Sequence, residues 1–354
     1  MSEVGESSSR KRKIARFADY NPRSKLPNAE QKAVDRLIKN SRKIIVTKFL
    51  DKNTLSSMRI LHIVRDMLER VGLEGHLDMV FPTIPLLTQE FLASLEWVHK
   101  YENDDGEEPT IGFRLRNSYR TLTMTKLREI LCISKLPTRN FQGLTEENNN
   151  EFFGIVSGGL GKTNDDSNFM FTHPAIHLCH RYTNQIFHGQ GTPTKAPQRT
   201  MRFLWAMTHL GNGVPDWARM FVDECRGTLY DSEDRPVSKG DISMGGLITV
   251  ITDSFYINYL DLKPAKGEIL FNAKGLVKSH CLHSTEPPMI WRCGTHHESY
   301  MRLPRQIPFP WEGNTSDLFA FPDDEYRQNF LYLPRVYDKV MEETGGVPMQ
   351  IDPQ

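Results

Sequence analysis

The sequence has no long hydrophobic run. No stretch approaches the roughly 18 consecutive apolar residues that a membrane span needs, and the N-terminal MSEVGESSSRKRK is polar where a signal peptide has its apolar core. These absences predict an intracellular protein that makes no membrane contact. Cysteine is also scarce, with five among 354 residues. An odd number at scattered positions argues against a disulfide framework and is typical of a reducing compartment.

The net charge of the whole chain is zero, but the two ends of the chain differ in charge. Lys+Arg and Asp+Glu both number 44, yet residues 1–48 hold 13 Lys and Arg against 5 Asp and Glu, and residues 49–354 offset this surplus of +8. Such a surplus can bind phosphate backbones by releasing counterions. The basic run Arg10–Lys13, which follows the Ser-rich leader, also fits a nuclear-import signal. The alternative interpretation is a solvated leader that binds no partner. We predict a disordered basic arm over residues 1–27, in which the nucleic-acid or import contacts are made by Arg10, Lys11, Arg12, Lys13 and Arg16.

Hydrophobic periodicity predicts a mainly helical fold. Apolar residues recur at three- and four-residue steps over 53–71, which predicts one amphipathic helix with Gly72 as its stop. Shorter helices are expected at 28–40 and 85–100. Beyond residue 140, buried helices are expected in HPAIHLCHRYTNQIF, QRTMRFLWAMTHL, VPDWARMFVDECRG and GGLITVITDSFYINYL.

A change to period-2 alternation interrupts the helices. Apolar and polar residues alternate over 111–115 and again over 119–123, RNS lies between them, and TMTKLREIL then returns to helical spacing. This pattern predicts a small β-hairpin near 110–123 that leads into a helix. The expected fold class is therefore mainly α, a multi-helix globular domain with that hairpin and the basic arm. We divide the chain into the arm 1–27, an N-terminal helical subdomain 28–140, a C-terminal helical subdomain 141–335 and a tail 336–354.

Two motifs imitate catalytic ones but lack a required feature. SGGLGKT, residues 157–163, ends like a phosphate-binding loop, yet Val156 stands where that motif needs its first glycine. FPDD, residues 321–324, imitates the paired aspartates of a polymerase, but Pro322 opposes a central strand and polar residues follow. No D-[ST]-G protease signature is present. We predict a protein that is not an enzyme, without catalytic residues or a small-molecule substrate.

The strongest metal candidate is HCLHSTEPPMIWRCGTHH, residues 280–297. A Cys-x-His pair and a Cys-x-x-His pair could together close a tetrahedral zinc site, formed by Cys281, His283, Cys293 and His296. The spacing matches no standard zinc finger, so the alternative is a local accumulation of these residues without a metal. No other cofactor is expected. A second group, His173, His177 and His180, falls on one helix face and is interpreted as partly buried histidines instead of ligands.

An ordered series of motifs resembles the Athila family, the first-open-reading-frame proteins of Arabidopsis-type retrotransposons. These motifs are HLDMVFPTIPLLTQEFLASLEW, GFRLRNSYRTLTMTKLREILCI, FFGIVSGG, FTHPAIHLCHRYTNQIFHGQG, RFLWAM and SMGGLITVI. The likeness covers roughly residues 45–335. It implies a protein encoded by, or derived from, a plant long-terminal-repeat element, and it brings no established catalytic residues. The chain departs from a standard capsid polyprotein because it has no C-x-x-C-x-x-x-x-H-x-x-x-x-C zinc knuckle.

Three functions are consistent with these observations. The first is a non-enzymatic retroelement protein that self-associates or scaffolds and contacts nucleic acid through its arm, in the nucleus or the cytoplasm. The second is a domesticated nuclear regulator, because the strand–turn–strand–helix block around 110–132 resembles the plant mobile domain. The third is a zinc-dependent enzyme that uses the Cys281 set.

Overall fold

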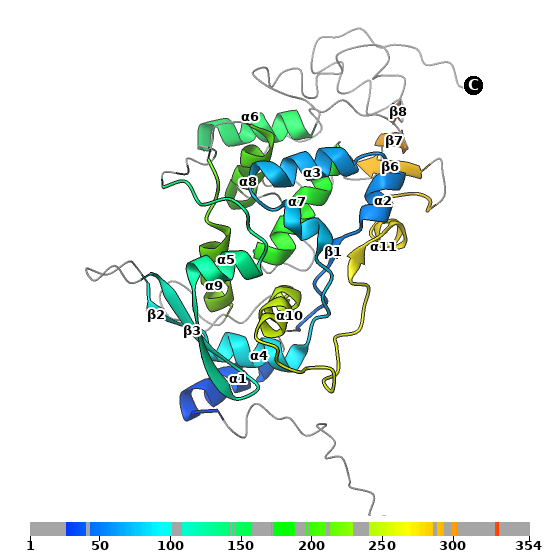
Figure 1. Cartoon of the computed structure of the whole chain (residues 1–354). Helices are drawn as coiled ribbons and strands as arrows, with labels where there is room; N and C mark the ends of the chain where they lie inside the picture. The colour runs from blue at the N-terminus through cyan, green and yellow to red at the C-terminus, as the bar shows by residue number, and fades with distance from the viewer. Residues whose placement is uncertain are drawn as a thin grey trace, which may run out of the picture.

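The computed structural model describes residues 26–39, 43–100, 108–139, 141, 144, 146–157, 171, 173–187, 196, 198–209, 213–228, 241–285, 289–293, 299–303 and 330–332. Helices dominate this part of the chain, as the sequence predicts, and three small sheets accompany them (Figure 1). None of the helices in the described ranges is long and apolar enough to cross a membrane.

The N-terminal helices follow the expected amphipathic patterns. Helix α1 (Asn28–Lys39) buries Ala33, Val34 and Leu37 and leaves its other face toward solvent. The following elements are β1 (Phe49–Leu50), α2 (Lys52–Ser57), α3 (Leu61–Arg70), the 3₁₀-helix η3 (Glu74–Asp78) and α4 (Pro85–Ser94).

The prediction of a single helix over 53–71 is wrong, because the structure has two helices there, α2 and α3. Arg59 adopts a left-handed φ of 57° between α2 and α3, and the Ile60 N–H donates to the Leu55 carbonyl across 3.0 Å. This is the hydrogen bond of a Schellman helix end. Ile60 is not among the residues that recur at helical spacing, and the break lets it reach the core, where it is fully buried. The recurring residues are Leu55, Met58, Leu61, Val64, Leu68 and Val71. The predicted stop is confirmed, since Gly72 takes a φ of 74° after α3.

A three-stranded antiparallel sheet forms in the order β2–β3–β4, from Glu96–His99, Thr110–Leu115 and Ser118–Thr123. The hairpin expected near 110–123 is therefore confirmed, and α5 (Met124–Ile130) follows it as predicted. The helix expected over 85–100 ends early, because residues 96–99 pair with β3. Ser94, the last residue of α4, accepts the Arg114 N–H at 2.7 Å through its hydroxyl. Tertiary pairing thus overrides the helical pattern of 95–100.

The C-terminal helices surround a central helix, α7. They are α6 (Glu146–Val156), α7 (Pro174–Phe187), α8 (Gln198–Thr208), α9 (Trp217–Gly227), α10 (Gly245–Ser254) and α11 (Ala273–Lys278). All 14 residues of α7 are buried, and it packs against α3, α8 and α9 (Figure 1). Each of the four C-terminal segments predicted as helical contains a helix. The last prediction is wrong over residues 255–260, because α10 ends at Ser254. Tyr256 takes a left-handed φ of 54°, the Ile257 N–H donates to the Thr252 carbonyl at 3.3 Å, and Tyr256 and Leu260 are exposed.

Long-range contacts join the two halves of the described chain. The Trp217 indole N–H in α9 donates to the Val71 carbonyl at 2.9 Å. The Thr47 hydroxyl, in the segment before β1, accepts the Gly246 N–H of α10 at 2.7 Å. One hydrophobic cluster includes buried residues from Ala33 to Trp291. Small strands complete the fold: β5 (Leu270–Phe271) pairs with β1, and β6 (Met289–Cys293), β7 (Ser299–Leu303) and β8 (Phe330–Tyr332) form the third sheet.

Candidate functional site

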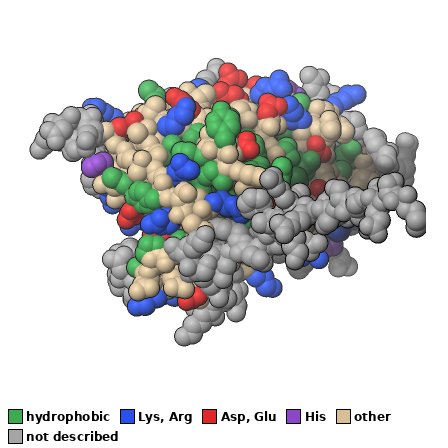
Figure 2. All heavy atoms as spheres, turned by 60° about the horizontal axis from the view of Figure 1, so that its bottom comes forward, with side chains coloured by type: hydrophobic (Ala, Val, Ile, Leu, Met, Phe, Trp, Pro, Cys, Tyr) green, Lys and Arg blue, Asp and Glu red, His purple; other side chains and the backbone are tan. Residues whose placement is uncertain are grey.

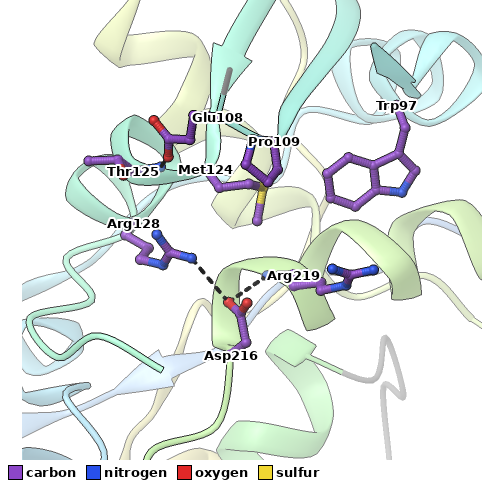
Figure 3. Close-up of a pocket in the computed structure, with 8 residues that line it drawn as sticks. All are labelled: Trp97, Glu108, Pro109, Met124, Thr125, Arg128, Asp216 and Arg219. Atoms are coloured by element: carbon purple, nitrogen blue, oxygen red, sulfur yellow. Dashed lines mark hydrogen bonds and ion pairs between the residues drawn. The ribbon is translucent and has the colours of Figure 1, made fainter. Parts of the chain in front are cut away.

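A pocket of about 270 Å³ opens between the β2–β3 sheet, α5 and α9 (Figure 3). This volume is just below the roughly 300 Å³ at which ordinary ligand pockets begin, so it suits one or two side chains better than a whole cofactor. Its walls combine apolar surface with charged groups, contributed by Trp97, Glu108, Pro109, Met124, Thr125, Arg128, Asp216 and Arg219.

Arg128 is the most unusual side chain of this pocket. Only 17% of it is exposed, and its Nη2 lies 3.7 Å from Asp216 Oδ1. A charge-assisted N–H···O bond is much shorter, roughly 2.7–2.9 Å. Its Nε is buried and has no hydrogen-bond partner in the part of the chain that the structure describes. A guanidinium keeps its charge in a protein, so Arg128 is a mostly buried cation whose Nε lacks a partner among the described residues.

Trp97 supplies the aromatic wall. The Arg219 guanidinium carbon lies 5.7 Å from the Trp97 ring centroid, within cation–π distance. The Trp97 indole nitrogen is buried without a hydrogen-bond partner among the described residues. Figure 3 shows Arg128 and Arg219 on opposite sides of Asp216, with Met124 and Pro109 above Asp216 and between Arg128 and Trp97.

The two carboxylates of the pocket already accept backbone hydrogen bonds. Asp216 caps α9 by accepting the Arg219 N–H at 3.2 Å, and Glu108 accepts the Thr125 N–H at 2.5 Å. Their positions are therefore fixed by the first turns of two helices. The pocket can accordingly offer guanidinium donors beside an apolar and aromatic surface, with its acids held in place.

The predicted zinc set is brought together in part. An isolated bridge pairs Leu282 with Trp291, and the Arg292 N–H donates to the Cys281 carbonyl at 2.9 Å. The segments that carry Cys281 and Cys293 therefore run side by side as antiparallel neighbours.

Those side chains of the zinc set that the structure describes contact residues outside the set. The Cys281 sulfur is buried and accepts from Arg181 Nη1 at 2.8 Å, while His283 Nδ1 contacts the Arg292 guanidinium. Within the described ranges no group of three or more His, Cys, Asp and Glu side chains could hold a metal ion. His296 and the side chain of Cys293 lie outside the described residues, so the zinc site stays a prediction.

The three histidines of α7 and its entry lie deeper than expected. His173, His177 and His180 are at most 1% exposed, where the sequence suggested partial burial. Burial lowers the pKa of His173 to about 3, with a smaller effect from His62 in the same direction. His180 Nε2 lies 3.1 Å from the Thr200 hydroxyl. These rings are packed between helices, which agrees with their interpretation as core residues.

The predicted arm residues, Arg10, Lys11, Arg12, Lys13 and Arg16, lie outside the described residues. On the described surface, the face that carries α1 and α4 interleaves basic, acidic and hydrophobic side chains (Figure 2). No single-sign patch is visible there.

Sequence reasoning did not identify the pocket. Trp97 was assigned to a helix, and Arg128 and Asp216 are far apart in the chain. The Asp-x-x-Arg spacing of Asp216 and Arg219 is an N-cap signal, but nothing local connects it to Arg128.

A scan against protein-family models, a search of curated proteins and a search of solved structures each found no match to this chain.

Proposed function

We propose that this chain is a non-enzymatic protein encoded by, or derived from, a plant long-terminal-repeat retrotransposon of the Athila type. It self-associates or scaffolds, and its basic N-terminal segment contacts nucleic acid in the nucleus. The observation that carries the proposal is the charge separation, +8 in residues 1–48 against −8 in the remainder. The order of the Athila-like motifs supports the retroelement origin.

The fold offers the arm a firm attachment. Three buried side chains hold α1 to the body, and Glu30 of this helix pairs with Arg114 Nε of β3 at 2.9 Å. The pair is about four-fifths buried on both sides, which makes it more than a surface ion pair. The helix that follows the arm in the sequence is therefore anchored beside the sheet.

The arm's contribution is tested by the salt dependence of binding to single-stranded RNA. Replacing the arm cations by Gln removes phosphate contacts, each worth about 0.7 in the slope of log K against log salt. We expect the slope to fall by about 3.5 and affinity at low salt to drop steeply in the variant that changes Arg10, Lys11, Arg12, Lys13 and Arg16.

A matched control removes the same charge from the described surface. This control variant should leave the slope close to that of the unchanged chain. It replaces five exposed lysines by Gln, namely Lys126, Lys263, Lys266, Lys274 and Lys278. If the two variants lose the same slope, binding follows net charge alone and the arm has no special role.

The second candidate is a domesticated nuclear regulator that uses the fold for protein contacts. The structure contains the strand–turn–strand–helix block on which the plant mobile domain resemblance rests, as β3, β4 and α5. Size-exclusion chromatography with light scattering, with and without RNA, separates the candidates. An oligomer that grows with RNA supports the scaffold, and a monomer indifferent to RNA supports the regulator.

A further inference from the structure

The pocket between β2, α5 and α9 holds a cation that the described residues satisfy incompletely. Arg128 is 17% exposed, and its closest carboxylate oxygen is 3.7 Å from Nη2. Burying a charge is costly unless hydrogen-bonding partners replace water. Asp216 is only a weak acceptor for the Arg128 guanidinium, because its Oδ1 also accepts the Arg219 N–H.

We propose that this pocket binds the carboxylate of an acidic peptide, with a neighbouring apolar side chain of the peptide packed against Trp97. Arg128 donates to the carboxylate, and the Trp97 ring supplies the aromatic wall for the neighbouring side chain. This inference concerns protein contacts of the body and is independent of the proposed retroelement role of the arm.

The charges in and around the pocket favour a carboxylate over a doubly charged group. Arg128 and Arg219 face two pocket acids, Asp216 and Glu108, and Arg219 also lies 3.7 Å from Asp223 Oδ2 at the solvent-exposed rim. A phosphate dianion would meet about twice the repulsion from these acids that a single carboxylate meets, and Arg128 offers one loosely paired positive charge. A guanidinium binds a carboxylate in a planar fork, and the whole pocket of about 270 Å³ has room for the carboxylate and an adjoining apolar side chain.

The apolar part of the pocket complements such a peptide. Met124 is buried, Pro109 is half-buried, and both line the space that Trp97 closes on one side (Figure 3). Asp223, which partners Arg219, is 51% exposed and does not line the pocket. A peptide with an acidic residue next to an aromatic one would place its carboxylate against Arg128 and its aromatic ring against Trp97.

The test uses the full chain and two small probes, N-acetyl-Phe-Asp-amide and N-acetyl-Phe-Asn-amide. The readout is the indole N–H resonance of Trp97, assigned by its loss in Trp97→Phe. We expect the Asp probe to shift this resonance with millimolar affinity, and the Asn probe to bind at least about tenfold more weakly, as one charge-assisted hydrogen bond predicts.

Variants locate the contact. Arg128→Gln should weaken the Asp probe about tenfold and remove its preference over the Asn probe. Lys126→Gln, on the exposed side of the same helix, should change nothing. The other indole resonances report whether each variant is folded, and the Asp and Asn comparison on the unchanged chain stands even if Arg128→Gln unfolds.

Three results would overturn the proposal. They are equal binding of the two probes, unchanged binding by a folded Arg128→Gln, and no shift of the Trp97 resonance at about 10 mM probe. Inorganic phosphate that shifts this resonance more strongly than the Asp probe would also reject the carboxylate assignment.

Discussion

His76 illustrates how single polar side chains are held in this core. Its ring is fully buried, its Nδ1 lies 2.8 Å from the Tyr182 hydroxyl, and Phe187 packs at 5.9 Å between ring centroids. Burial lowers the pKa of His76 to about 4, while hydrogen bonding to the Leu131 backbone acts in the opposite direction. The neutral imidazole is therefore the form that the folded chain accommodates.

This lowered pKa makes stability depend on pH. From pH 6.5 down to about 4, the unfolded chain holds a proton at His76 that the folded chain does not. The free energy of unfolding should therefore be highest above pH 6.5 and fall on acidification, by up to about 1.4 kcal/mol per pH unit for this one group. His173 and His177, whose pKa values are also lowered by burial, add to the same trend.

Urea unfolding at pH 7, 6 and 5 measures the effect. His76→Gln keeps a hydrogen-bond partner for Tyr182 and removes the titrating ring, so its stability should decline less steeply with acid. Parallel curves for the variant and the unchanged chain would show that His76 does not titrate on unfolding.

At the scale of elements, the β3–β4 hairpin depends on a carboxylate from another element. Arg116 and Asn117 form the turn with φ values of 55° and 65°, which is the pattern of a type I′ turn. The fully buried carboxylate of Glu90 in α4 accepts the Arg116 N–H at 2.7 Å and the Asn117 N–H at 2.5 Å. Helix α4 thus fixes the turn as well as supporting the sheet.

Removing this carboxylate should destabilise the protein. In Glu90→Gln one amide oxygen replaces two carboxylate oxygens, so a buried turn N–H loses its acceptor, at a cost of about 1–3 kcal/mol. Chemical denaturation measures the change, and hydrogen exchange should show faster opening of β4 amides. Glu129→Gln is the control, because Glu129 is 59% exposed and its ion pair contributes at most about 0.5 kcal/mol. Equal losses in the two variants would contradict the role given to Glu90.

At the scale of the whole molecule, the contacts between distant segments predict cooperative folding. Trp217 reaches Val71, and Thr47 binds α10. One hydrophobic cluster includes side chains from both expected subdomains, 28–140 and 141–335. The boundary between them stays a prediction, and the cluster that spans it joins the two ranges in one core.

We expect a single unfolding transition. Intrinsic fluorescence and far-ultraviolet circular dichroism should give coincident denaturation curves, and residues 28–140 expressed alone should unfold without a sharp transition. Two separate transitions, or a cooperatively folded 28–140 fragment, would show that the subdomains are independent.

The sequence alone predicted the mainly helical class, the hairpin, the stop at Gly72 and the buried C-terminal helices. These features depend on local signals, namely hydrophobic period, turn residues and caps, which act over a few residues. The arm and its five cations, and the zinc set of Cys281, His283, Cys293 and His296, are also sequence predictions. The five cations, His296 and the side chain of Cys293 lie outside the described residues.

Only the tertiary structure decided where residues 95–100 and Arg59 would depart from the helical pattern. Residues 96–99 become a strand because β3 offers unpaired backbone groups beside them, and Arg59 turns because Ile60 can then enter the core. The pocket arises in the same way, since Trp97, Arg128 and Asp216 meet only after the sheet packs against α5 and α9. Contacts of this kind depend on distances between segments, and no local pattern of residues specifies those distances.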